Sequence, residues 1–276
     1  MDITIQNIVE TIQYFTESSY GKSEVRWIEP IGVAMAAGYR KVHNIEDFPC
    51  PYARQMTEGR HSQGGTYTAI HNIQTRADVE IVRNRLVTTL MEGFEIDSPQ
   101  EHNDCKQYLN HMFSELLNNV ADHAQSPVGG YTMAQYYRQH GKVQFAIADC
   151  GCGFLKNIEI KYPQVKNEQE AIAKAMEKSV TASCNQMYNQ SRNAGYGLYT
   201  LEFILRDTEG VLLIISNGSY MMMCKGRKEY GEMSVPWSGT VVAFEFFHKN
   251  TNYNFEHMRN KWLLPDDEAG EEDFFL

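Results

Sequence analysis

The chain has 276 residues, of which 42% are apolar and 22% charged, and its formal net charge is -10. This is the composition of a globular protein with one large domain or two small ones. Its first residues form no signal sequence, and no segment approaches the roughly 20 apolar residues that span a bilayer, so we expect no membrane partner. The acidic balance argues against broad nucleic-acid binding, which needs clustered Lys and Arg.

Six cysteines are scattered along the chain, which is too long to depend on disulfide bonds for its stability. Their distribution suits a reducing compartment, so we expect free thiols and a cytoplasmic protein. The six are Cys50, Cys105, Cys150, Cys152, Cys184 and Cys224.

Hydrophobic periodicity predicts alternating helices and strands. In chain order, we expect a helix over 4–16, a strand over 24–28, a helix over 31–40, a strand over 66–70, helices over 78–91 and 105–124, a strand over 143–148, a helix over 168–178, a helix from 198, and strands over 211–216 and 240–247. In the second half, the order helix, strand, long polar loop, helix, strand predicts an α+β sandwich and not a Rossmann sheet.

Changes in this pattern predict three regions. Residues 1–97 are expected to form a small α/β domain, and residues 98–250 a second domain. Residues 251–276 form an acidic tail that ends in three apolar residues. This tail is interpreted either as disordered, solubilising sequence or as an apolar peptide that docks on a partner.

Three polar residues share one edge of the helix predicted over 105–124. With Glu115 at zero, Asn119 lies about 40° away and Asp122 about 20° away on the other side, given 3.6 residues per turn. Apolar residues fill the neighbouring arc, so this edge can overlook a cleft beside the core. The alternative is a polar margin that faces only solvent.

A turn with two glycines follows the strand predicted over 143–148. Asp149 ends this strand, and Gly151 and Gly153 follow in the turn. Glycines there permit a positive φ or the close approach of a ligand, although they often only reverse the chain. The segment lacks the third glycine of a dinucleotide-binding fingerprint.

Two further glycine segments come later in the chain. Gly195 and Gly197 end a polar stretch, and Leu198 begins an apolar helix. A glycine-rich loop that leads into a helix N-terminus offers N–H groups and the positive end of the helix dipole to phosphate. Gly239 and Thr240 open the last predicted strand.

The segments ELLNNVADHA, DCGCGF, GYGL and GT occur in this order, with a long polar insert before the third. Together they resemble the N, G1, G2 and G3 boxes of the GHKL superfamily, which comprises gyrase, heat-shock chaperones, histidine kinases and MutL. The resemblance covers about the second half of the chain. It implies a two-layer α/β sandwich of the GHKL (Bergerat) type over 98–250, with ATP and Mg²⁺ as ligands.

The resemblance also implies roles for individual residues. Glu115 matches the glutamate that activates water, Asn119 matches the asparagine that coordinates magnesium, and Asp122 matches a polar position near the nucleotide. Asp149 matches the aspartate that accepts a hydrogen bond from the adenine amino group. The other positions that it assigns to the nucleotide site are Gly151, Gly153, Gly195, Gly197, Leu198 and Thr240.

By the same resemblance, residues 155–194 correspond to the ATP lid. Arg192 lies in this segment and is a candidate for contact with a phosphate. The alternative for Arg192 is a solvated loop charge.

We therefore expect an ATP-binding regulatory protein with slow magnesium-dependent hydrolysis, whose lid controls an unidentified protein partner. We find no lysine placed to act from another domain, so turnover is expected to be slow or partner-dependent. One alternative is a protein serine kinase, because the HA that ends the first segment is similar to the anti-sigma type of GHKL protein. Another is a nucleotide-gated interaction module without turnover.

The segment VRWIEPIGVAMAAGYRKV resembles the STAS-like modules that accompany such domains in bacteria. This resemblance implies a bacterial regulator. A homodimer is left open as one arrangement of the chain.

Overall fold

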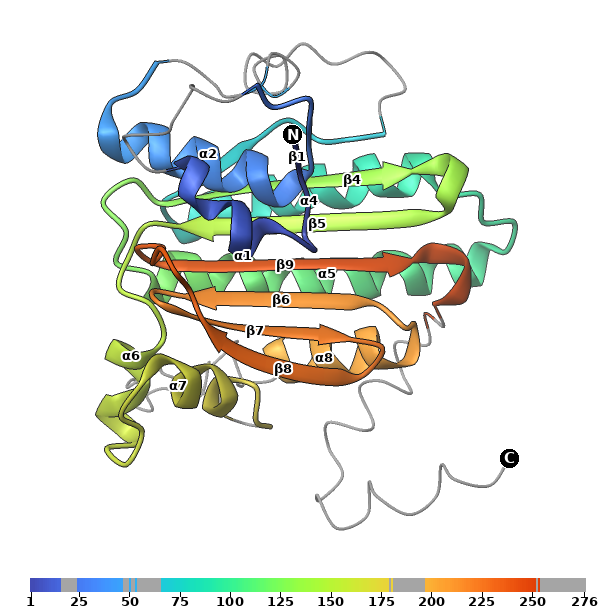
Figure 1. Ribbon diagram of the computed structural model, residues 1–276. Helices are drawn as coiled ribbons and strands as arrows, with labels where there is room; N and C mark the ends of the chain where they lie inside the picture. The colour runs from blue at the N-terminus through green and yellow to red at the C-terminus, as the bar shows by residue number, and fades with distance from the viewer. Residues whose placement is uncertain are drawn as a thin grey trace.

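A seven-stranded antiparallel sheet forms the centre of the computed structural model (Figure 1), which describes residues 1–15, 24–46, 50, 53, 66–178, 180, 197–251 and 253. The strand order is β3-β4-β5-β9-β6-β7-β8. The strands are β3 (His71–Ile73), β4 (Gly130–Tyr137), β5 (Lys142–Asp149), β6 (Val211–Ser216), β7 (Ser219–Cys224), β8 (Arg227–Glu232) and β9 (Thr240–Phe247). Because β9 pairs with both β5 and β6, the ends of β5 and β6 and the start of β9 lie side by side at the same end of the sheet.

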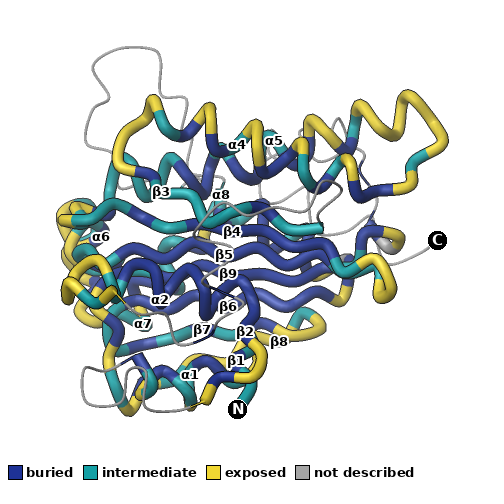
Figure 2. The backbone as a smooth tube through the Cα atoms, turned by 90° about the horizontal axis from the view of Figure 1, so that it is seen from above, coloured by how far each residue is buried: buried dark blue, intermediate teal, exposed yellow. Residues whose placement is uncertain are grey.

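Helices cover both faces of this sheet, which gives an α+β fold in three layers (Figure 2). The back layer contains α4 (Arg76–Gly93), α5 (Pro99–His123) and α8 (Gly197–Asp207). The front layer contains α1 (Ile8–Thr11), a 3-10 turn (Ile12–Phe15) and α2 (Pro30–His43). Two short helices, α6 (Leu155–Lys161) and α7 (Glu168–Ala175), lie at one end of the sheet.

The long helix α5 packs its apolar stripe on the back of the sheet. Ser98 caps its first turn by accepting a hydrogen bond from the Glu101 N–H at 3.4 Å. Further along, the ring of Phe113 stacks on Phe145 of β5 at 4.9 Å, and Phe145 stacks on Phe244 of β9 at 5.0 Å. This aromatic column sets the position of α5 relative to the two central strands.

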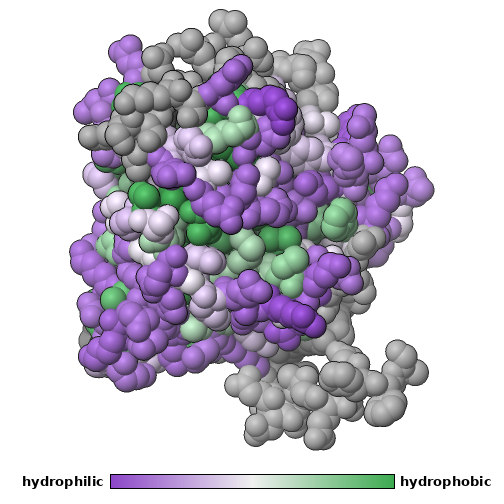
Figure 3. All heavy atoms as spheres, in the orientation of Figure 1, coloured by the Kyte–Doolittle hydropathy of each residue, from purple (hydrophilic) through white to green (hydrophobic). Residues whose placement is uncertain are grey.

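The front face is covered by the first part of the chain. Two short strands, β1 (Asp2–Ile3) and β2 (Trp27–Ile28), pair in parallel beside α2. Glu29 connects this unit to the central sheet. Its carboxylate accepts a hydrogen bond from the Ile5 N–H at 2.8 Å and lies 3.9 Å from the ammonium of Lys142 in β5. Figure 3 shows that apolar residues gather over the middle of this face between hydrophilic margins.

The boundary expected at residue 97 does not divide the packing. Strand β3, from the predicted first domain, pairs with β4, and α4 shares one hydrophobic cluster with α5. The front layer in turn forms a second cluster with Met133, Ala146 and other residues on the front of the same sheet. Residues 1–97 therefore build parts of all three layers, and without them the front face of the sheet would be uncovered.

Most predicted elements are present, but some positions differ. The strand expected over 66–70 begins only at His71, with one isolated bridge between Tyr67 and Gln135 before it. The helix expected over 4–16 is a short α-helix that continues as a 3-10 turn to Phe15. The tail beyond residue 253 lies outside the described residues.

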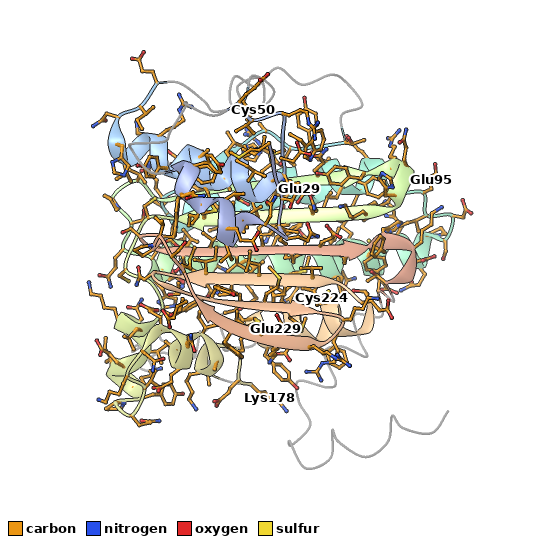
Figure 4. The ribbon with its side chains drawn as sticks, viewed as in Figure 1. Glu29, Cys50, Glu95, Lys178, Cys224 and Glu229 are labelled. Carbon is orange, nitrogen blue, oxygen red and sulfur yellow. The ribbon has the colours of Figure 1, made fainter. Side chains whose placement is uncertain are left out.

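The described cysteines are all free thiols, as predicted, and Cys184 lies outside the described part. Figure 4 labels Cys224 and Glu229, which come from β7 and from the edge strand β8. Within the described ranges, no helix combines the length and apolar character needed to cross a membrane.

Candidate functional site

A pocket lies at the end of the sheet where β5 and β6 end and β9 begins, on the side covered by α5. Figure 1 shows α5 behind these strands. Its walls come from α5, β5, α6, the end of α7, the start of α8 and β9. The polar or glycine residues that line it are Glu115, Asn119, His123, Asp149, Gly153, Asn157, Gly197 and Thr240. The pocket thus brings together residues from all four sequence segments that were singled out above.

Glu115 and Asn119 occupy adjacent turns of α5 and face the pocket, as the helical spacing predicts. Glu115 is only 8% exposed, and its carboxylate has no hydrogen-bond partner among the described residues. Burial therefore raises the pKa of Glu115 from 4.5 to about 7. The start of α8 lies against this carboxylate, since a Cβ added to Gly197 would lie 3.2 Å from Glu115 Oε2.

Asp149 lies at the end of β5 and is 2% exposed. Its Oδ1 accepts hydrogen bonds from the N–H groups of Gly151 at 2.8 Å and Thr240 at 3.2 Å. Burial raises the pKa of Asp149 to about 6, although these two hydrogen bonds act in the opposite direction. Both bonds go to Oδ1, so Oδ2 can accept a hydrogen bond from a ligand in the pocket.

Apolar side chains form the rest of the pocket. Leu116 and Val120 of α5 face Ile147 of β5 and Val242 of β9, and Leu198 and Ile158 contribute from α8 and α6. A pocket with apolar walls that also presents the Asp149 carboxylate suits a flat heteroaromatic ring with an amino group.

The turn after β5 is held by a set of partly buried polar contacts. Gly153 has φ +74°, and a Cβ there would collide with the side-chain amide of Asn217. Asn217 donates hydrogen bonds to the Cys152 carbonyl at 3.2 Å and to Glu168 at 2.6 Å, and its Oδ1 accepts one from the Gly239 N–H at 3.0 Å. These contacts link the turn after β5, the turn after β6 and the turn before β9, all beside the pocket.

Trp237 supports Asp149 from behind. Its indole N–H donates to the Asp149 carbonyl at 2.9 Å, and its backbone N–H donates to the Asn217 carbonyl at 2.9 Å. Trp237, Asn217 and Glu168 were not among the site residues predicted from the sequence. The local sequence feature that pointed to this region was a tryptophan shortly before the predicted strand start at Gly239 and Thr240.

Other predicted site residues have different surroundings. Asp122 does not line the pocket; its carboxylate is bound at both oxygens by Arg76 of α4, at 2.6 and 2.7 Å. This ion pair faces away because Asp122 falls on the α4 side of the helix edge. Gly151 packs against the Ala124 carbonyl at the end of α5. Arg192 and Gly195 lie outside the described residues.

Comparison of the sequence with known protein families finds no match, and comparison with curated proteins finds no similar one. The chemistry of the site is therefore argued from its geometry. Burial lowers the pKa of His123, which favours a neutral imidazole at the pocket wall.

A resident metal bound only by protein groups is not indicated. Within the described ranges, no three His, Cys, Asp or Glu side chains cluster closely enough to hold an ion. The Asn119 amide oxygen is an oxygen donor of the kind that Mg²⁺ accepts, and Mg²⁺ usually takes its other ligands from phosphates and water. The donor set thus fits a metal that arrives with a nucleotide.

Proposed function

We propose that the protein binds an adenine nucleotide with Mg²⁺ in this pocket and hydrolyses it slowly, as a regulatory ATPase with a GHKL-type sandwich. The supporting observation is the meeting of Asp149, Asn119 and Glu115 in one pocket. Asp149 suits the adenine base, Asn119 suits the magnesium at the phosphates, and Glu115 suits the attacking water. Together they suit ATP better than a small metabolite that lacks a base or phosphates.

Asp149 would select the base of the nucleotide by hydrogen bonding. Its Oδ2, which accepts no hydrogen bond from the described residues, can accept one from the adenine amino group, whereas guanine presents a carbonyl oxygen at the equivalent position. Two acceptors facing each other without a proton repel, so GTP would bind more weakly. The apolar walls would hold the ring by its two faces.

Asn119 and the N-terminus of α8 would serve the phosphates. Asn119 would coordinate Mg²⁺, which supplies neutralisation of the phosphate charge when bound. The positive end of the α8 dipole at Gly197 favours anions in the same region. Glu115 would orient the attacking water and accept its proton, because a pKa near neutrality suits a general base. Closure of a lid, the role expected for 155–194, would then control a protein partner; residues 179 and 181–194 of this segment lie outside the described part of the chain.

The experiment that tests this proposal is calorimetric titration with ATP and GTP, with and without Mg²⁺. ATP should bind in preference to GTP, and Asp149→Ala should weaken ATP binding by about 1 to 3 kcal/mol, the range for losing a hydrogen bond to a charged group. Asn119→Ala should remove most of the magnesium dependence. Asp122→Asn is the matched control, because its carboxylate bonds Arg76 outside the pocket lining.

Equal affinity for ATP and GTP in the parent protein would rule out base recognition by Asp149. If ATP binds without release of phosphate, a nucleotide-gated module replaces the ATPase. Transfer of labelled phosphate to a serine of another protein would instead identify a kinase.

A further inference from the structure

We propose that Glu168 is a positioning residue, which sets the shape of the base-binding end of the pocket through Asn217 and links it to α7. The inference rests on the proposed function for its effect on nucleotide affinity. Its geometric part concerns the protein alone and can be tested without a nucleotide.

Glu168 begins α7, outside the pocket lining, but its carboxylate points toward the end of β6. Its Oε2 accepts hydrogen bonds from the Ser216 hydroxyl at 2.6 Å and from the Leu155 N–H at 3.2 Å. Its Oε1 accepts one from the Asn217 amide at 2.6 Å. Short bonds to an ionised acceptor are stronger than neutral ones, so one carboxylate joins α6, α7 and β6.

The same carboxylate reaches the two turns that present Asp149 and Thr240. Through Asn217 it is joined to the Cys152 carbonyl in the turn after β5, and to the Gly239 N–H directly before β9. Gly153, which lines the pocket, lies directly above it, because a Cβ there would approach Glu168 Oε1 to 2.9 Å. Movement of Glu168 would therefore displace Gly153 and the part of the pocket wall that it forms.

A neutral amide cannot replace this carboxylate. Both oxygens of Glu168 act as acceptors, and they serve donors on opposite sides. In a Glu168→Gln variant, one side would present an NH₂ group to a donor, either to Asn217 or to the Ser216 and Leu155 pair. Asn217 cannot simply rotate its amide, since its Oδ1 already accepts the Gly239 N–H.

The neighbouring Glu170 provides a matched control. It caps the same helix by accepting the Lys166 N–H at 2.7 Å and the Asn167 amide at 2.8 Å. None of these groups belongs to the pocket or to the turns around it. Glu170→Gln thus disturbs the first turn of α7 and leaves the link to Asn217 intact.

The first readout is the indole N–H resonance of Trp237 in the nucleotide-free, ¹⁵N-labelled protein. The chain has three tryptophans, and the resonance that Trp237→Phe removes identifies the one hydrogen-bonded to the Asp149 carbonyl. Glu168→Gln should shift this resonance, because Trp237 is also bonded to the Asn217 backbone. Glu170→Gln should leave it in place.

The second readout is the affinity for ADP with Mg²⁺, measured by calorimetry. Glu168→Gln should weaken binding by about tenfold, the effect of one misplaced charged hydrogen bond, and Glu170→Gln by less than about twofold. Thermal unfolding checks that each variant is folded at the temperature used. If Glu168→Gln does not fold, Ser216→Ala removes one donor to the same carboxylate and should give a smaller loss in the same direction.

The positioning role would be overturned if Glu168→Gln leaves the Trp237 resonance unshifted. It would also be overturned if the parent protein binds ADP and Glu168→Gln binds it with the same affinity. Equal effects of the Glu168 and Glu170 substitutions would also overturn it, because they would show a general effect of α7 stability. If the parent binds no ADP but Glu168→Gln still shifts the resonance, the positioning role stands and the nucleotide assignment fails.

Discussion

Two buried carboxylates in the pocket differ in how they are solvated by the protein. Asp149 accepts two backbone N–H bonds, whereas Glu115 has no hydrogen-bond partner among the described residues. Burial raises the pKa of both groups, to about 7 for Glu115 and about 6 for Asp149, but only in Asp149 do hydrogen bonds from described residues oppose the rise. Glu115, which accepts no hydrogen bond from the described residues, is the carboxylate suited to bind a water molecule and take its proton.

Glu115→Gln separates hydrolysis from binding. The variant should keep its ATP affinity within a few fold but turn over about 10² to 10⁴ times more slowly, the usual contribution of a positioned general base. In the parent, phosphate release should rise as the pH increases through about 7, because Glu115 must be ionised to accept a proton. Phosphate-release kinetics from pH 6 to 9 measure both effects. Parent-like turnover in the variant would leave Glu115 without a chemical role.

The same substitution should change stability in a pH-dependent way. Because the pKa of Glu115 is about 7 in the folded protein and 4.5 ordinarily, the folded state holds the proton more tightly. Its contribution to stability is full below about pH 4.5 and is lost as the pH rises through about 7. Glu115→Gln should therefore raise the free energy of unfolding at pH 8 by about 1 to 3 kcal/mol and change it little at pH 4. Urea denaturation at the two pH values provides the measurement, and a stabilisation that is equal at both would contradict the ionisation argument.

At the level of elements, the sequence was most informative where burial is periodic. The helices α2, α4 and α5 and the strands β5, β6 and β9 were predicted because each has many apolar residues, either regularly spaced or in a run. The edge strand β8 was missed because Arg227–Glu232 is charged and largely exposed, and so shows no alternation. Strand β4 was missed because the buried polar residues Thr132 and Gln135 interrupt its apolar sequence, which neither alternates nor forms a continuous run.

The candidate site was predictable in part for the same reason. Glu115 and Asn119 follow from helical spacing, and Asp149 and Thr240 from their places at strand ends. Glu168 and Asn217 could not be found in this way, because they are 49 residues apart and only the packing of α7 against β6 joins them. The partner of Asp122 depends equally on the packing of α4 beside α5.

The turn before β9 offers a test of close packing at the pocket. Gly239 has φ +113°, and an added Cβ would collide with the Asp149 carbonyl and lie 2.5 Å from the Gly151 nitrogen. Gly239→Ala should lower the free energy of unfolding by about 1 to 3 kcal/mol through strain and should also weaken ATP binding.

Gly141→Ala is the control for backbone strain alone, since Gly141 has φ +62° and an added Cβ there would meet nothing within 4 Å. It should cost less stability and leave ATP affinity unchanged. Urea denaturation and calorimetry on both variants make the comparison. A similar loss of affinity in the two variants would show that the contacts of Gly239 do not matter for the site.

On the scale of the whole molecule, one sheet serves two hydrophobic clusters. Ile31 of α2 belongs to the front cluster and Leu109 of α5 to the back cluster, and strands between them contribute side chains to both. Loss of either layer would expose one face of the sheet to water, so the layers should unfold together.

Ile31→Ala and Leu109→Ala should therefore move one shared unfolding transition. Each should lower the free energy of unfolding by about 2 to 5 kcal/mol, the usual cost of such a deletion in a core. Urea denaturation followed by both circular dichroism and tryptophan fluorescence should give coincident curves. Two separate transitions, each sensitive to one substitution, would favour independent domains divided near residue 97.

The position of β9 has a consequence for the growing chain on the ribosome. β9 is the last strand of the described residues to be synthesised, yet it lies between β5 and β6. Until it emerges, β3, β4 and β5 cannot join β6, β7 and β8, and both halves keep an unpaired edge. The nascent protein must therefore delay folding or be shielded by a chaperone until its central strand arrives, and the pocket closes in the same late step because β9 carries Thr240.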